Sequence, residues 1–267
     1  MKKFWNLTLD ELERSQKFYS VFLIGLILAE TMHIIWRITV SLRQIQEGYA
    51  NMISLYQLFD GSKPYLLIVS AGVLGLLGYS LFSWVREWYF QGNYIQRLLL
   101  LPESRFPVAL AKVFSTLLMA GGMLCVQMLL IGLTNILAGR FLPYYQAIVA
   151  PAEYIQAMSV TRLYLPITPK AWFLNYSIGI GFYLALTNAV ILLLSRRDLT
   201  LPRKLFHTAV FATISFVSVT LYVRWYYQLD FLPGEVTRYA LLFVSVIVFM
   251  LGQLIFMKWL MDRYVAI

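Results

Sequence analysis

Residues 64–85 read PYLLIVSAGVLGLLGYSLFSWV, an apolar run without a single charged side chain. The hydrocarbon core of a membrane is about 30 Å thick, and about 20 helical residues cross it. The run has that length. Its apolar residues follow one another continuously, whereas a membrane-spanning β-strand would alternate them with polar ones. Residues 64–85 therefore predict a transmembrane helix.

The same pattern recurs along the chain, which is 60% hydrophobic and only 13% charged. A soluble domain usually has about 25% charged residues, so most of this chain is expected to lie in lipid. We find no internal repeat and expect one integral domain over residues 1–267, an all-α polytopic membrane protein with six transmembrane helices. The other five spans are expected at 18–38, 113–139, 171–195, 206–223 and 239–257.

Basic residues between the spans predict the orientation. If the N-terminus is cytoplasmic, 14 of the 22 Lys and Arg residues fall on the cytoplasmic side, in agreement with the positive-inside rule. Both termini are therefore expected inside, and segments 42–63 and 140–170 outside. The net charge of +9 follows from the same bias, so nucleic acid is not an expected partner. One cysteine and two histidines make a disulfide framework or a metal centre unexpected.

The first residues carry the signals of a helix start. Thr8 is a candidate N-cap, and Glu11 follows three residues later as its partner in a capping box. Trp5, Leu9 and Leu12 would share one side of that helix. We expect a short interfacial helix at the membrane surface. A frayed cytoplasmic tail is the alternative.

A polar interval at residues 86–112, REWYFQGNYIQRLLLLPESRFPVALAK, separates the second span from the third. Residues 94–101 can form about two helical turns, and Leu101 precedes a proline, which ends the helix there. Pro107 suits the first turn of the third span. The interval is thus expected to hold a short helix on the cytoplasmic face. This helix either docks a partner or rests its leucines in lipid.

Residues 98–112, LLLLPESRFPVALAK, resemble the permease subunits of type-2 ABC transporters. Members of this family have six helices and cytoplasmic termini, and the loop between their second and third spans forms a coupling helix. The architecture of the whole chain is similar to that plan, although the long outer segment 140–170 departs from the commonest layout. The resemblance implies that an ATP-binding subunit docks on residues 94–105. The docking residues would be Tyr94, Arg97, Leu98, Leu101, Pro102, Glu103, Ser104 and Arg105.

The resemblance also implies the function and the partners. The chain would form the translocation path of an exporter in the bacterial cytoplasmic membrane, as a homo- or heterodimer of permease subunits with two copies of the ATP-binding subunit. Amphipathic peptides, such as bacteriocins and antimicrobial peptides, or drug-like hydrophobic compounds are typical cargo of the family. The sequence contains no GxxxxGK[ST] motif, so ATP and Mg²⁺ are expected in the partner chain. No cofactor or enzymatic activity is expected in this one.

Glu30, His33 and Arg37 lie on one stripe of the first span, with Glu30 near the middle of the membrane. A charge at that depth costs about 3 kcal/mol or more unless it is paired or hydrated. One interpretation is a polar patch on the translocation path or the subunit interface, with Glu30 and His33 as partners and Arg37 extending outward. The alternative is an internal link that locks this helix to a neighbour. Its candidate partners are Gln127 and Asn188.

Small residues in the second and third spans allow helices to approach closely. Tight packing within the chain is favoured over a dimer seam. The residues concerned are Gly72, Gly75, Gly78, Ala120, Gly121 and Gly122.

Two other functions remain alternatives. A secondary transporter or channel-like membrane protein ranks second, because such transporters usually have several buried ionisable groups and broken spans. An intramembrane enzyme would need catalytic groups that meet on facing helices. Its only candidates are Glu30, His33 and His207, and His207 lies at the cytoplasmic end of its span.

Overall fold

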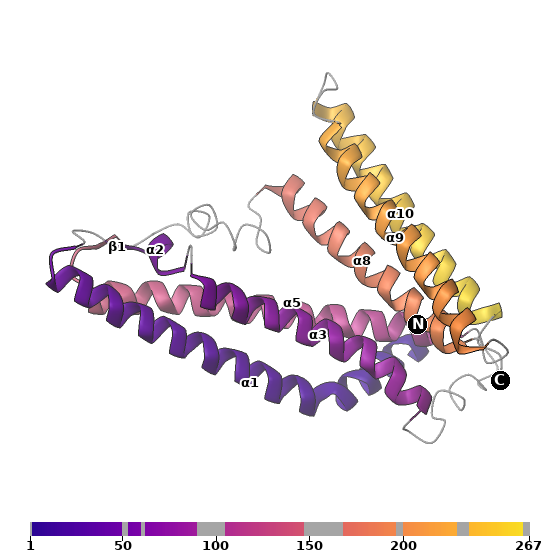
Figure 1. Ribbon diagram of the computed structural model, residues 1–267, viewed down its shortest axis with the longest axis horizontal. Coiled ribbons are helices and arrows are strands. Elements are labelled where there is room, and N and C mark those ends of the chain that lie inside the picture. The colour runs from indigo at the N-terminus through magenta and orange to yellow at the C-terminus, as the bar shows by residue number, and fades with distance from the viewer. Residues whose placement is uncertain are drawn as a thin grey trace. The chain divides into compact units, whose positions relative to one another are not determined.

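The computed structural model describes residues 2–49, 53–59, 62–89, 105–146, 168–195, 200–228 and 235–263. Helices make up almost all of this part of the chain, as Figure 1 shows. The elements in chain order are α1 (Lys2–Gln46), β1 (Ile53–Ser54), α2 (Leu55–Phe59), α3 (Lys63–Tyr89), α5 (Phe106–Phe141), β2 (Tyr145–Gln146), α8 (Pro169–Ser195), α9 (Leu201–Gln228) and α10 (Glu235–Arg263).

Each of the six expected spans lies inside one long helix of the described part, so the predicted helix positions are confirmed. Five helices in the described part of the chain, namely α1, α3, α5, α8 and α10, are long and apolar enough to cross a membrane. The protein is an all-α polytopic membrane protein. A further helix, α9, has 28 residues and is therefore about 42 Å long. Its length is sufficient, and its crossing of the membrane stays a prediction.

The first helix begins earlier than expected. α1 runs without a break from Lys2, so the prediction of an N-cap at Thr8 is wrong. The Thr8 hydroxyl donates a hydrogen bond to the Phe4 carbonyl at 2.9 Å, one turn back in the same helix. Threonine satisfies its hydroxyl in this way when it lies inside a helix instead of at its start. Trp5 and Leu9 are more than half exposed, and their position at the membrane surface stays a prediction.

Gly48 ends α1. Its φ of 77° lies in the left-handed region, which a residue with a Cβ atom rarely adopts. The Gly48 amide donates to the Ile45 carbonyl at 3.1 Å, and the Tyr49 amide donates to the Gln44 carbonyl at 2.9 Å. This pair of bonds is a Schellman motif, which satisfies carbonyls that the end of a helix leaves free.

The chain divides into two compact units, and the long helices α1, α3, α5 and α8 contribute to both. The first unit consists of Met1–Leu9, Leu77–Phe114 and Phe173–Ile267. The second consists of Asp10–Leu76 and Ser115–Trp172.

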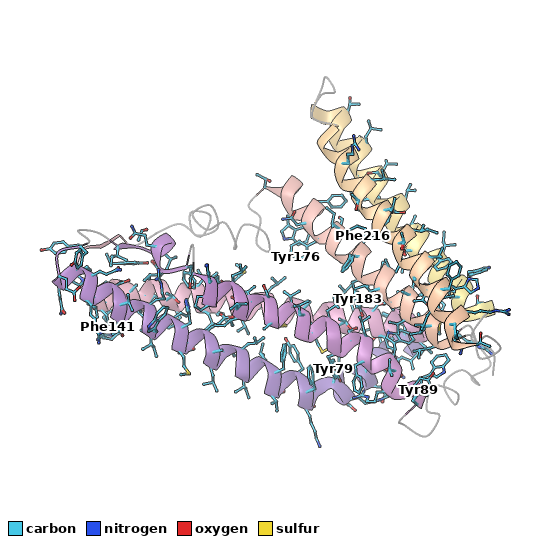
Figure 2. The ribbon with its side chains drawn as sticks, viewed as in Figure 1. Tyr79, Tyr89, Phe141, Tyr176, Tyr183 and Phe216 are labelled. Carbon is cyan, nitrogen blue, oxygen red and sulfur yellow. The ribbon has the colours of Figure 1, made fainter. Side chains whose placement is uncertain are left out.

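In the first unit, α8 packs against α10 and is linked to α3. Asn188 donates from its side-chain amide to the Gln253 side chain at 3.0 Å. Tyr183, labelled on α8 in Figure 2, shares a hydrogen bond of 2.6 Å with Ser80 of α3. Gly181 faces the ring of Phe249, where a Cβ atom would overlap that ring. These contacts hold three helices together through buried polar groups and a close backbone approach.

In the second unit, an apolar core gathers around the short elements that follow α1 and α5. The two strands pair in parallel, with Ile53 opposite Tyr145 and Ser54 opposite the next residue. The sequence predicted only a polar outer segment at 42–63, so this core was not foreseen. Its buried members are Ile34, Ile38, Ile53, Leu55, Leu58, Phe59, Tyr65, Ile131, Ala138 and Leu142.

Glycines permit close helix contacts in the second unit, which confirms tight packing within the chain at three of the expected positions. A Cβ atom at Gly72 would lie 3.1 Å from Cε of Met123, and one at Gly75 would overlap the ring of Phe22. A Cβ atom at Gly122 would lie 2.5 Å from the Tyr19 hydroxyl. Nothing lies within 4 Å of the corresponding positions at Gly78 and Gly121.

We predict that Gly75→Leu destabilises the protein and that Gly78→Leu does not. A side chain at residue 75 must displace the Phe22 ring, and overpacking of this kind costs about 1–3 kcal/mol. At residue 78 nothing lies within 4 Å of an added Cβ atom, and the position is exposed. Thermal denaturation of the two variants in one detergent checks the difference. Equal melting temperatures would contradict it.

Candidate functional site

Most of the expected docking residues lie outside the described part of the chain. Arg105 is within it and directly precedes α5, where its carbonyl accepts a hydrogen bond from the Val108 amide at 3.1 Å. Pro107 lies in the first turn of α5, as predicted. The docking role stays a prediction for Arg105 and for all the others. They are Tyr94, Arg97, Leu98, Leu101, Pro102, Glu103 and Ser104.

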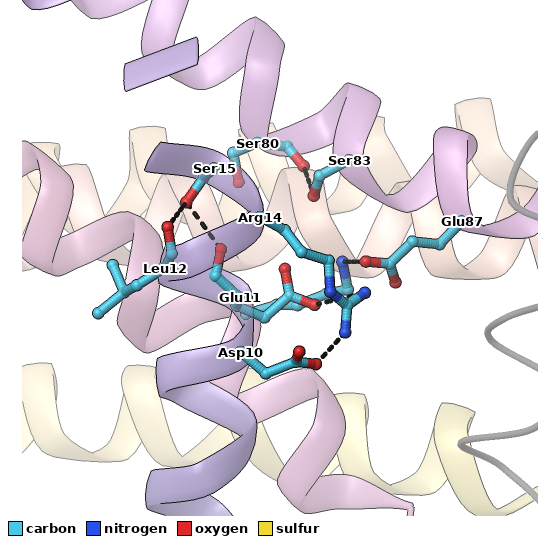
Figure 3. A network of polar contacts seen from close by, with 9 residues as sticks. Asp10, Glu11, Leu12, Arg14, Ser15, Ser80, Ser83 and Glu87 are labelled. Carbon is cyan, nitrogen blue, oxygen red and sulfur yellow. Dashed lines mark hydrogen bonds and ion pairs between the residues drawn. The ribbon is translucent and has the colours of Figure 1, made fainter. Parts of the chain in front are cut away.

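A buried ion pair joins the two helices that flank this segment. Nζ of Lys112 on α5 lies 2.8 Å from Oε1 of Glu87 on α3, as the dashed line at Glu87 in Figure 3 marks. The two side chains are only 2% and 0% exposed. The Lys112 ammonium also lies 5.1 Å from the centre of the Trp84 ring, which is fully buried. Removal of one partner of such a pair typically costs about 3–5 kcal/mol.

Aromatic side chains join the first turns of α5 to the first turn of α1. The Phe114 ring lies two residues beyond Lys112 on α5 and contacts Phe4 and Trp5, with ring centres 5.6 and 5.8 Å apart. We call Phe4, Trp5, Trp84, Glu87, Lys112 and Phe114 the base cluster. Sequence reasoning did not identify Glu87 as part of a site. The sequence does contain a signal for the pair: Glu87 follows one apolar run, and the oppositely charged Lys112 precedes the next.

The polar stripe of α1 lies in the second unit and is turned toward other helices of the same chain. Glu30 is 2% exposed and His33 is 6% exposed. The Gln127 side-chain amide of α5 donates a hydrogen bond to Oε1 of Glu30. The Tyr65 hydroxyl of α3 in turn donates to Oε1 of Gln127 at 3.5 Å. The internal link to Gln127 is thus confirmed, whereas Asn188, the other expected partner, bonds to α10.

His33 makes a separate connection. Its Nε2 lies 2.7 Å from the Ser62 hydroxyl, just before α3, so its partner is this serine. Its ring stacks on Tyr65, with centres 6.0 Å apart and planes 27° apart. Nδ1 is buried and has no hydrogen-bond partner among the described residues. His33 therefore orders the start of α3 against α1.

Arg37 holds the short helix α2. Its Nε donates to the Leu58 carbonyl at 3.1 Å, and its Nη2 donates to the Gln57 carbonyl. The side chain is half-buried, and its guanidinium is bound to α2. A cation at the last carbonyls of a helix satisfies groups that the helix leaves free.

The polar stripe of α1 links three different parts of the second unit. Each polar side chain of the stripe bonds to a different element: Glu30 to α5, His33 to the residue before α3, and Arg37 to α2. No group of three or more His, Cys, Asp or Glu that could hold a metal ion is found in the described ranges. Neither a protein-family model, nor a curated protein, nor a solved structure matches the chain.

We predict that Gln127→Leu destabilises the protein and that adding Glu30→Leu restores part of the loss. The single change removes a donor from a buried carboxylate, which costs about 1–3 kcal/mol. The double change removes both polar groups and leaves an apolar contact. Met128→Leu is the control, because Met128 is half exposed beside Gln127. Melting temperatures in detergent measure the effect, and an additive double variant would contradict the link.

Proposed function

We propose that the chain is a permease subunit of a bacterial ABC exporter, which works as a dimer with two separate ATP-binding subunits. The pattern at 98–112, placed between two long apolar helices, carries the proposal. The position of Pro107 in the first turn of α5 agrees with the pattern and supports the proposal. The absence of a P-loop from the sequence means that ATP would have to be bound by a partner.

In the proposed mechanism, ATP binding brings the two ATP-binding subunits together. Each subunit moves the segment 94–105 that is docked on it. Leu98 and Leu101 supply the apolar contact with the partner, and Arg97 and Arg105 flank this contact with positive charge. The movement passes into α3 and α5 and alternates the access of the translocation path between the two sides of the membrane. Amphipathic peptides or drug-like hydrophobic compounds are the proposed cargo.

The outer surfaces of the helices suit both lipid and a second permease subunit. Large apolar side chains are exposed along α1, at Val21, Leu28 and Met32 among others. An apolar patch of this extent would be a liability on a soluble monomer, whereas a bilayer covers it. This supports a position in the membrane.

A secondary transporter is the second candidate, and the buried stripe of α1 favours it. Glu30 is an ionisable group in the middle of an apolar helix, which is typical of sites that carry a proton or an ion. In that case transport would need an ion gradient and would proceed without an ATP-binding chain.

We predict that the tagged chain, purified in mild detergent from the cells that encode it, carries a stoichiometric protein with a P-loop. Leu101→Asp and Arg105→Glu should each weaken this association by about tenfold or more, because they alter the proposed contact. Arg140→Glu is the matched control, since Arg140 is exposed at the other end of α5.

Mass spectrometry of the purified complexes measures the partner. A partner that both docking variants retain would contradict docking by this segment. The secondary transporter would be favoured by two results together: no P-loop protein copurifies, and an ion gradient alone drives uptake of an amphipathic peptide or a drug-like hydrophobic compound into proteoliposomes.

A further inference from the structure

The Glu87–Lys112 ion pair joins the two helices that flank the proposed docking segment 94–105. Glu87 lies in the last turn of α3, which ends at Tyr89, and Lys112 lies in the second turn of α5, which begins at Phe106. The chain between these helices is the segment that would bind the ATP-binding subunit. The pair therefore links the helices at the point where the segment leaves one and enters the other.

The pair is built to hold one geometry. Both side chains are buried, and the contact of 2.8 Å brings opposite charges together where water is excluded, so their attraction is strong. The Trp84 ring lies 5.1 Å from the ammonium on the same helix as Glu87, so α3 contacts Lys112 twice. A cation–π contact of this kind strengthens when the cation is desolvated.

The stability of the folded protein does not by itself explain why an ion pair occupies these two positions. Two apolar side chains of similar volume often serve as well as a buried ion pair, because desolvation of the charges offsets their attraction. Apolar contacts, however, tolerate a sliding helix. If α3 slid by one turn along α5, Glu87 would leave the Lys112 ammonium, and both charges would remain away from water. The ion pair thus fixes the register of the two helices.

A third helix, α1, contacts α5 close to Lys112 along the chain. Phe4 and Trp5 of α1 pack on Phe114, which follows Lys112 by two residues. The first turn of α1 therefore contacts α5 within one turn of Lys112, and all of these residues belong to the first unit.

We propose that Glu87 and Lys112 are positioning residues for energy coupling. Their ion pair keeps the two ends of the docking segment in fixed register, so that a movement of the ATP-binding partner shifts α3 and α5 instead of being absorbed between them. This inference rests on the proposed function. The register itself can be measured without the partner.

The first test measures the register directly. Spin labels are placed at Tyr89→Cys on α3 and Leu110→Cys on α5, in a Cys125→Ser background because Cys125 is an exposed free thiol. The distance distribution between the labels should be narrow in this background and broad after Glu87→Leu with Lys112→Met. The charge swap, Glu87→Lys with Lys112→Glu, should restore a narrow distribution. An unchanged distribution in the apolar double variant overturns the proposal.

The second test measures coupling in the complete complex, reconstituted in proteoliposomes with its ATP-binding subunit. The apolar double variant should keep its melting temperature within about 3 °C and retain the partner. Its transport per ATP hydrolysed should fall about tenfold, within the range that coupling free energies span. The charge swap should recover most of that loss. An apolar double variant whose transport per ATP hydrolysed is unchanged overturns the proposal.

A matched control separates register from charge. Arg14 and Asp10 form an ion pair within α1 that is partly exposed, as Figure 3 also shows. Asp10→Asn with Arg14→Gln should leave both measurements unchanged. If the labels report loss of register while no P-loop protein associates with the chain, the proposed exporter function fails, and only the role of the pair in fixing the register of α3 and α5 remains. If the partner binds and the register is unchanged, only the positioning role fails.

Discussion

The constraint on which this structure depends is that lipid offers no hydrogen bonds to a peptide backbone. Every amide and carbonyl inside the hydrocarbon core must find its partner within the protein, and a helix provides all of them within one segment. The long helices of this chain, 27 to 45 residues, exceed the roughly 20 residues that cross the core. Their ends therefore reach the polar regions, where Gly48 and Arg37 satisfy the carbonyls that a helix end leaves free.

Polar side chains inside these helices meet the same constraint in three ways. Hydroxyls donate back to their own helix, as Thr134 does to the Leu130 carbonyl at 2.7 Å. Such a bond requires no second helix. Amides and carboxylates link neighbouring helices, as in the bond between Gln127 and Glu30. The opposite charges of the base cluster neutralise one another. Only the second and third ways fix one helix against another, so the informative polar residues are those whose partners lie on a different helix.

Sequence reasoning located the long helices because continuous apolar runs report length directly, and it placed the start of α5 because Pro107 restricts the backbone locally. It also offered Gln127 as a partner of Glu30, since few polar side chains occur at that depth. It did not find the Glu87–Lys112 pair or the Arg37 link to α2. Both depend on which helices become neighbours, and single-sequence periodicity carries no such information. The N-cap expected at Thr8 failed because the preceding residues also form helix, which lets the hydroxyl bond to Phe4.

The short strand pair in the second unit has a consequence for how the chain is assembled. Ile53 and Tyr145 can pair only if they emerge on the same side of the membrane, which requires an even number of crossings between them. The helices α3 and α5 provide two. Strand β1 is synthesised before α3 and α5, and its partner β2 is synthesised after them. The two strands can therefore pair only after both helices have been inserted. A non-local contact of this kind is slow to form, so the apolar core of the second unit forms late, and only after α3 and α5 have been inserted correctly.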